Sequence, residues 1–167
     1  MEPWQRLNEA GDAEARAMLA TCCGSSRWIE RMLTRRPFAD QPALLAAARD
    51  EWEALGENDW REAFAHHPRI GDRASLERRF PTTAGLSAGE QRGVDRAAPD
   101  VIAALAEAND AYVRRFGYIF IVRASGRSAE EMLEALRARL HNEPATELRV
   151  AAGAQAEITA LRLNGLR

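Results

Sequence analysis

Apolar residues recur at three- and four-residue intervals through most of this chain, which is the spacing that lines up one face of an α-helix. The longest such run begins near Pro99 and carries these residues on one face: Val101, Leu105, Ala108, Tyr112 and Phe116. Helix-start signals precede other runs, such as an N-capping Asp40 and the capping-box spacing of Ser128 and Glu131. The pattern predicts an all-α protein.

Short polar, proline or glycine connectors separate the predicted helices. Helices are expected from the N-cap Asp12 to near Gly24, from about Ser26, from Asp40 to Gly56, from Asn58 to Ala65, from Ser87, from Pro99 to Phe116, from Ser128, and from "HNEP" to near the C-terminus. Residues 71–86 are expected to form a partly helical surface excursion. Residues 117–122, "GYIFIV", are expected to form one short extended segment because β-branched and aromatic types dominate it. With no internal repeat and 46% hydrophobic content, residues 1–167 are expected to form a single-domain multi-helix bundle.

Charge and composition argue against several classes of partner. The formal net charge is −2 and no window concentrates basic residues with interleaved aromatics, so nucleic acid is not an expected partner. No apolar run has the length of a membrane span and no leader pattern occurs, so a cytoplasmic protein is expected. The adjacent Cys22 and Cys23 give no disulfide framework, which also favours a reducing compartment.

Lysine is absent, because all 23 of the Lys+Arg residues are arginine. A Schiff base on the protein, and with it a covalently held pyridoxal phosphate, is therefore excluded unless the N-terminal amine serves. Neither an H-x-x-x-H nor a C-x-x-C spacing occurs, and His141 lies far along the chain from the other two histidines. The sequence predicts a protein with no metal site and no organic cofactor.

Two of the three histidines stand together in "HHPRIGD", residues 66–72. The residue before a proline is disfavoured in helical conformation, so the chain should leave its helix at His67 and present that side chain at the helix end. Clefts between helices often open at such ends, which makes His67 a candidate functional residue. The structural alternative is that one of the two histidines packs at the helix end and the other is solvated.

Glu90 and Arg162 each have two interpretations. The spacing of Ser87 and Glu90 is that of a capping box, and the same helix N-terminus, with Gln91 beside it, also favours an anionic ligand. Arg162 falls on the apolar face of the last predicted helix, together with residues such as Thr159. An inward-pointing arginine needs an anion, which is either a protein carboxylate or the carboxylate of a bound ligand.

Five stretches carry a family resemblance: "HHPRIGD", "LSAGEQRG", "RRFGYIFIVRASGRSAEEML", "RLHNEPATELRVA" and "ITALRL". In this order they resemble the 2-oxo-4-hydroxy-4-carboxy-5-ureidoimidazoline (OHCU) decarboxylase family of uric acid breakdown, and the similarity extends from about Leu7 to Leu163. The resemblance implies the all-α fold of that family. It also implies a homodimer that decarboxylates OHCU to (S)-allantoin without a cofactor, after urate oxidation and hydroxyisourate hydrolysis.

The resemblance also implies roles for individual residues. His67 is implied as the central catalytic residue, and Glu90 as a second catalytic group. Substrate contacts are implied for Pro68, Ser87, Gln91 and the carboxylate-binding Arg162, and for the backbone of Phe120, Ile121, Val122, Arg123 and Ala124. At Arg123 this chain departs from the family, which usually has a small or thiol residue there.

The chemistry of that substrate suits a chain without lysine or metal ligands. The carbon that loses CO₂ bears a hydroxyl and adjoins a ring imine, so the electrons left behind can flow into the imine. The protein then has to hold the carboxylate, manage the hydroxyl proton and protonate the neighbouring carbon from one face. His67 suits proton transfer near neutral pH, and Glu90 would orient it or hold developing charge. The competing hypothesis is a non-catalytic helical ligand-binding or interaction module. A hydrolase of the same pathway is a further alternative, but the sequence has no activated Ser or Cys arrangement to support it.

Overall fold

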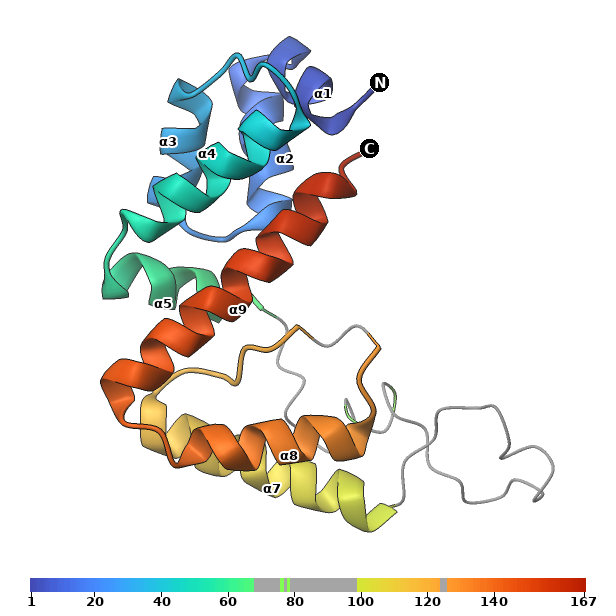
Figure 1. Ribbon diagram of the computed structural model, residues 1–167, viewed down its shortest axis with the longest axis vertical. Coiled ribbons are helices and arrows are strands. Elements are labelled where there is room, and N and C mark those ends of the chain that lie inside the picture. The colour runs from blue at the N-terminus through green and yellow to red at the C-terminus, as the bar shows by residue number, and fades with distance from the viewer. Residues whose placement is uncertain (68–75, 77, 79–98, 124–125) are drawn as a thin grey trace, which may run out of the picture. The chain divides into compact units, whose positions relative to one another are not determined.

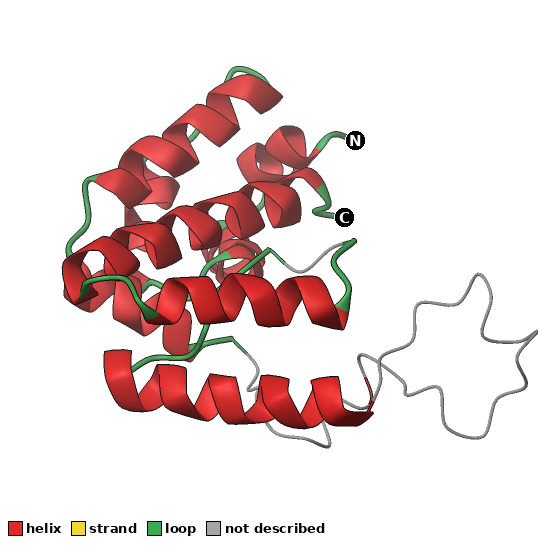
Figure 2. Cartoon of the chain, turned by 60° about the horizontal axis from the view of Figure 1, so that its bottom comes forward, coloured by secondary structure: helices red, strands yellow, loops and turns green. Residues whose placement is uncertain are grey.

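The computed structural model describes residues 1–67, 76, 78, 99–123 and 126–167 (Figure 1). In this part of the chain Figure 2 shows helices joined by loops, and no strand. The helices are α1 (Pro3–Glu9), α2 (Asp12–Cys22), α3 (Ser26–Thr34), α4 (Gln41–Glu53), α5 (Glu57–Ala65), α7 (Pro99–Phe116), α8 (Ala129–Leu140) and α9 (Pro144–Asn164). The all-α prediction is confirmed. None of the described helices combines the length and the apolar character needed to cross a membrane.

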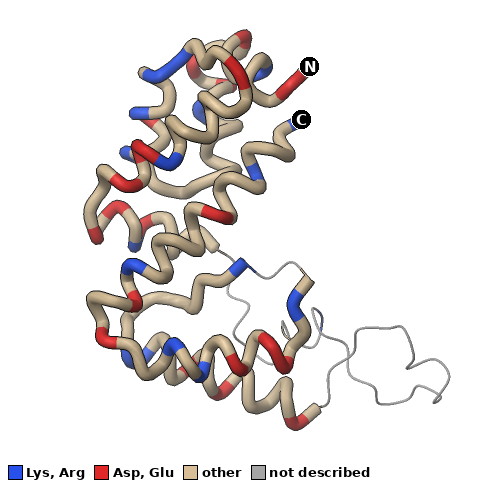
Figure 3. Tube along the Cα trace, in the orientation of Figure 1, with Lys and Arg blue, Asp and Glu red and all other residues tan. Residues whose placement is uncertain are grey.

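The backbone packs into two compact units. The first unit comprises Met1–His67 and Leu148–Arg167, and the second comprises Pro68–Glu147. The first turn of α9 therefore belongs to the second unit and the remainder of that helix to the first. Figure 3 shows acidic and basic residues interspersed along the described helices of both units. That residues 1–167 form a single domain stays a prediction.

The core of the first unit is built from α1 to α5 and from α9. α3 packs against α2, α4 and α5, and α1 packs against α2 and α4. Its largest fully buried side chains are Trp28, Phe64, Leu7, Leu19, Met32, Leu44 and Leu163. The Trp52 indole of α4 donates a hydrogen bond to the Ala152 carbonyl of α9 at 2.9 Å, so α9 is held to the bundle by a polar contact as well as by packing.

Local capping signals account for several helix boundaries. The Asp40 carboxylate accepts a hydrogen bond from the Ala43 amide at 2.8 Å, and Ser128 caps α8 through the Glu131 amide at 3.1 Å, as the sequence predicts. The N-cap prediction at Asp12 is wrong by one residue. Gly11 is the N-cap of α2, and Asp12 is the first helical residue, where its negative charge still favours the helix N-terminus.

The second unit has α7 and α8 packed against each other. Figure 1 shows the two helices running in the same direction, so the connection between them has to return to the start of α8. The described parts of this connection, 117–123 and 126–128, form neither helix nor strand. Ile102, Leu105 and Tyr112 of α7 and Leu136 of α8 are fully buried. The expected partly helical excursion at 71–86 lies almost wholly outside the described residues.

Candidate active site

His67 lies at the end of α5, where the sequence predicts that the chain leaves the helix. α5 ends at Ala65, and His66 is its C-cap residue. The His67 amide still donates to the Phe64 carbonyl at 3.2 Å, which closes the last turn. His66 is exposed and His67 is half-buried. The two adjacent histidines therefore have different surroundings, as expected if only one of them is functional.

Gly24 allows this helix end to approach the start of α3. A methyl group at position 24 would lie 2.5 Å from both Cβ and Cγ of His66, closer than real side-chain atoms approach. The close contact leaves no room for any side chain at Gly24. The sequence reading gave this glycine only the role of ending a helix, which missed its packing role.

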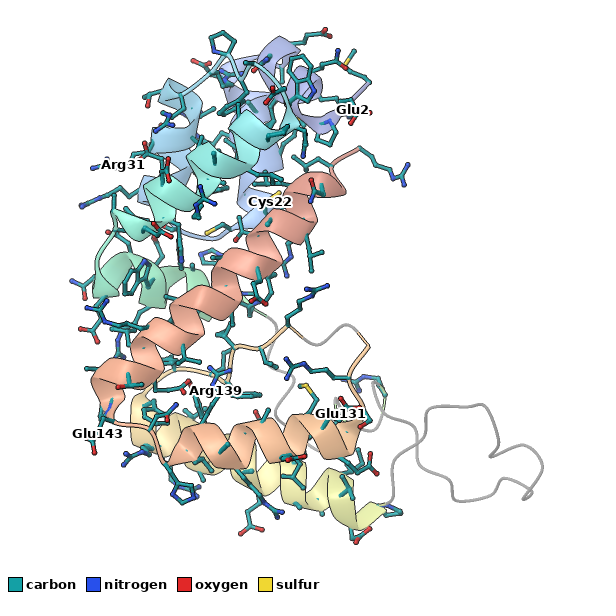
Figure 4. The ribbon with its side chains drawn as sticks, in the orientation of Figure 1. Glu2, Cys22, Arg31, Glu131, Arg139 and Glu143 are labelled. Carbon is teal, nitrogen blue, oxygen red and sulfur yellow. The ribbon has the colours of Figure 1, made fainter. Side chains whose placement is uncertain are left out.

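Two polar side chains, those of Gln155 and Thr159, connect His67 to the end of α2. His67 Nε2 forms a hydrogen bond with Gln155 Oε1, and Gln155 Nε2 donates to Thr159 Oγ1 at 3.0 Å. Thr159 Oγ1 in turn donates to the Cys22 carbonyl at 3.4 Å. Figure 4 shows Cys22 at the end of α2 next to α9. Sequence reasoning missed Gln155, although a glutamine one turn before Thr159 on an apolar helix face is a signal of a buried polar contact.

The surroundings of His67 keep its imidazole neutral. Burial lowers the pKa of His67, and the positive charges of Arg162 and His66 lower it further, whereas the hydrogen bond with Gln155 acts in the opposite direction. The pKa of His67 therefore lies below its ordinary value of 6.5. Near neutral pH the side chain has a free lone pair and can accept a proton.

Arg162 requires a correction. The apolar face of α9 was expected to carry it inward, but the buried residues of that face are Ala151, Ala152, Gln155, Thr159 and Leu163, and Arg162 is exposed. It sits in the last turn of the helix, where a long side chain extends past the core into solvent. Its positive charge nevertheless acts on this region: it adds to the lowering of the His67 pKa and opposes the larger rise that burial gives the pKa values of Cys22 and Cys23.

Among the described residues Arg162 has no carboxylate partner within ion-pair distance. The ion pairs that the structure records among the described residues involve other arginines, such as Arg36 with Asp12. Of the two interpretations from the sequence, an internal carboxylate therefore finds no support in the described part of the chain. A ligand carboxylate as the anion of Arg162 stays a prediction.

The predicted substrate-binding segment follows α7 in the second unit. Ile121 is buried, Phe120 and Val122 are half-buried, and Arg123 is exposed. Arg139 of α8 donates to the Ile121 carbonyl at 2.6 Å, and its guanidinium carbon lies 4.5 Å from the centre of the Phe120 ring. Figure 4 shows Arg139 on the side of α8 that faces this segment. One arginine thus fixes both the backbone and a side chain of the segment.

A buried carboxylate holds Arg139 in turn. Glu147 is fully buried, and Arg139 Nη2 lies 2.6 Å from Glu147 Oε2. Asn142 Nδ2 donates to Glu147 Oε1 at 3.1 Å, and the Tyr112 hydroxyl donates to Oε2. Burial, and then this hydrogen bond, raises the pKa of Tyr112, so the hydroxyl keeps its proton. The stretch "RLHNEPATE" contains three of these residues, but their spacing alone does not reveal that they meet.

Five of the sequence-predicted site residues lie outside the described residues. They are Pro68, Ser87, Glu90, Gln91 and Ala124. Their roles stay predictions, including the capping box at Ser87 and Glu90. Within the described residues, no three His, Cys, Asp or Glu side chains are grouped so as to hold a metal ion.

Comparison with known proteins places the chain in a family. The family model for OHCU decarboxylase matches residues 8–164. The chain belongs to the OHCU decarboxylase family. A crystal structure of OHCU decarboxylase in the presence of (S)-allantoin shares its fold with a TM-score of 0.71 at 37% sequence identity, over 94% of this chain and 98% of that chain. A crystal structure of (S)-allantoin synthase, at 19% identity and a TM-score of 0.70, agrees in fold.

Relatives of this family differ in length. The uric acid degradation bifunctional protein TTL of Arabidopsis thaliana is 38% identical over 85% of this chain, but the match spans only 44% of that protein. The 2-oxo-4-hydroxy-4-carboxy-5-ureidoimidazoline decarboxylase of Halalkalicoccus jeotgali is 25% identical over 84% of this chain and 78% of its own length. The chain therefore corresponds to less than half of the Arabidopsis relative and to most of the Halalkalicoccus one.

Proposed function

We propose that the protein decarboxylates 2-oxo-4-hydroxy-4-carboxy-5-ureidoimidazoline to (S)-allantoin in uric acid degradation and is therefore a carboxy-lyase. Membership of the OHCU decarboxylase family over residues 8–164 supports the reaction. The observation that carries the proposal is the pairing of His67 with Arg162. His67 is a half-buried, neutral imidazole at a helix end, and the charge of Arg162 acts on it. Among the described residues, the Arg162 guanidinium has no carboxylate partner. A proton acceptor next to a carboxylate-binding cation is what this substrate requires.

The reaction can proceed on the substrate's own electrons. The bond from the ring carbon to the carboxylate breaks, CO₂ leaves, and the electron pair shifts toward the ring imine, whose nitrogen takes up one proton. The resulting enol gives up its hydroxyl proton, and the neighbouring carbon gains a proton, which completes the product. The protein contributes position and proton transfer, so we propose that it uses neither metal nor organic cofactor.

We assign the groups of this reaction as the family resemblance implies. Arg162 holds the scissile carboxylate in a forked bond. His67 exchanges the hydroxyl proton with the substrate, and Glu90 is the second catalytic group. The segment Phe120–Ala124 contacts the ring and ureido amides through its backbone, together with Pro68, Ser87 and Gln91. The anchoring of Ile121 and Phe120 by Arg139 supports a segment of fixed conformation, which backbone recognition needs.

We also propose a cytoplasmic homodimer. The family resemblance supports the dimer, and light scattering at several protein concentrations tests it. Two free, buried cysteines, Cys22 and Cys23, support a reducing compartment such as the cytoplasm. Fractionation of cells that produce the protein tests the location.

The release of CO₂ from freshly prepared substrate tests the proposed reaction. The substrate is generated in place from urate with urate oxidase and hydroxyisourate hydrolase, with and without this protein. We expect the protein to accelerate CO₂ release strongly over the spontaneous rate. Tight binding of an allantoin-like ligand with CO₂ release at the spontaneous rate would instead indicate a ligand-binding module.

A further inference from the structure

We propose that Gln155 and Thr159 hold neutral His67 in the tautomer that has its proton on Nε2, so that Nδ1 is the ring nitrogen that exchanges protons with the substrate. The tautomer follows from the hydrogen bonds alone. The role of Nδ1 rests on the proposed function. Gln155 and Thr159 are thereby positioning residues, because they act through His67.

The direction of the hydrogen-bond chain is fixed at its far end. The Cys22 carbonyl can only accept, so the Thr159 hydroxyl uses its single proton to donate to it at 3.4 Å. Thr159 Oγ1 can then only accept from Gln155, at 3.0 Å. The atom of Gln155 that faces Thr159 must therefore be the amide nitrogen, and the amide oxygen must face His67. An oxygen without a proton requires a donor, which is the Nε2–H group of His67.

Burial makes the opposite arrangement unfavourable. Gln155 is fully buried and Thr159 is 5% exposed, so water does not replace a lost partner. If the Gln155 amide were reversed, Thr159 would have to donate to Gln155, and the Cys22 carbonyl would lose its hydroxyl donor. The Cys23 thiol also lies within hydrogen-bonding reach of Thr159, but burial raises the pKa of Cys23 to about 11, so the thiol stays protonated and can donate to the Thr159 hydroxyl without needing its proton.

The other ring nitrogen is left for chemistry. His67 Nδ1 makes no hydrogen bond within the described part of the chain, while Nε2 is engaged by Gln155. In the Nε2–H tautomer Nδ1 carries the lone pair and is the base. Among the described residues, the charged or titratable groups that act on the ring are Arg162 and His66, and both oppose its protonation. Nδ1 is therefore the ring nitrogen that is free to take a proton from a bound group.

Nitrogen NMR on the full chain labelled with ¹⁵N-histidine tests the tautomer without reference to activity. Long-range ¹H–¹⁵N correlation distinguishes protonated from unprotonated ring nitrogens, and loss of one signal set in His67→Asn assigns His67. Above its pKa we expect Nε2 to be protonated and Nδ1 to be bare. A bare Nε2 with a protonated Nδ1 would overturn the proposal.

A matched pair at position 159 tests the hydrogen-bond chain. Thr159→Ser keeps the hydroxyl, so the tautomer should stay as in the wild type. Thr159→Val has nearly the same shape without the hydroxyl, so Gln155 is free to reverse and the His67 signals should show a mixture of tautomers. Circular dichroism verifies that both variants fold. Unchanged signals in a folded Thr159→Val would show that the chain does not set the tautomer.

A carboxylate at position 155 tests the link to catalysis. Gln155→Glu places a negative charge next to Nε2–H and should raise the pKa of His67, both in the NMR titration and in the acid limb of kcat/KM. Gln155→Leu should lower kcat by about tenfold or more, the scale known for groups that orient a histidine ligand. If Gln155→Glu changes the pKa of His67 in the NMR titration but not the pH profile of kcat/KM, His67 Nδ1 does not take part in the reaction. A wild type with the Nε2–H tautomer but no decarboxylase activity would instead refute the proposed function and leave the tautomer standing.

Discussion

At the scale of single residues, the two adjacent histidines differ although both follow the end of α5 at Ala65. His66 caps the helix and is exposed, whereas His67 turns back to Gln155 of α9, 88 residues along the chain. The burial that lowers the pKa of His67 makes it a base near neutral pH, and His66 lacks this environment.

We expect His67→Asn to lower kcat by at least about a hundredfold, since a positioned acid or base typically contributes that much. His66→Asn is the matched control and should stay close to the wild type. Steady-state kinetics on freshly prepared substrate, with circular dichroism as a check of folding, compares the two. Equal losses in two folded variants would refute the assignment of His67.

For Arg162, exposure and the absence of a carboxylate partner in the described residues predict a variant that loses function but not stability. Arg162→Gln should reduce kcat/KM strongly while the melting temperature without ligand stays near that of the wild type. Arg162→Lys should recover only part of the activity, because a point charge cannot form the forked bond. A variant that melts much earlier with nearly normal kcat/KM would make Arg162 a structural residue.

At the scale of elements, the close approach of α5 to the start of α3 depends on Gly24. Gly24→Ala brings a methyl group to 2.5 Å from His66 Cβ, so we expect a loss of about 1–3 kcal/mol of unfolding free energy, as in overpacked cores. The shift of His66 should also reduce kcat through His67. Gly153→Ala on α9, with nothing within 4 Å of the added carbon, is the control, and it should stabilise by roughly 0.5–1 kcal/mol. Urea denaturation of both variants measures the contrast, and a neutral Gly24→Ala would show that the helices separate readily.

In the second unit, the ion pair of Arg139 and Glu147 joins α8, the start of α9 and the segment around Ile121. Glu147→Gln leaves the guanidinium of Arg139, which is only 13% exposed, without its counter-charge and should cost about 3–5 kcal/mol of unfolding free energy. The exposed Glu157 of the same helix is the control, and Glu157→Gln should change stability by less than about 0.5 kcal/mol. Similar stabilities for the two variants in urea denaturation would argue against the buried pair as an anchor.

The sequence predicts elements better than contacts between them, for a physical reason. Asp40, Ser128 and Pro99 mark helix starts because capping and proline effects act within one turn, and these boundaries are confirmed. The contact of His67 with Gln155 and that of Arg139 with Ile121 join separate elements, so no local periodicity encodes them. Arg162 shows the limit of periodicity itself, because a helical wheel gives the side of a helix but not where the core beneath it ends.

At the scale of the whole molecule, we propose an enzyme whose substrate supplies the electron sink and whose side chains supply position and a proton. The proposed reaction uses no metal, and no lysine is present in the sequence to form a Schiff base. Family membership over residues 8–164 and the fold shared with OHCU decarboxylase support the same reaction.

Circular dichroism of the allantoin formed from freshly oxidised urate plus hydroxyisourate hydrolase tests this account most directly. The protein is first treated exhaustively with chelator and dialysed, so the same experiment tests independence from metal and cofactor. We predict rapid formation of (S)-allantoin at the rate of the untreated protein, and racemic product at the spontaneous rate with His67→Asn. Racemic product with the wild type, or activity that returns only when a divalent metal is added, would contradict the account.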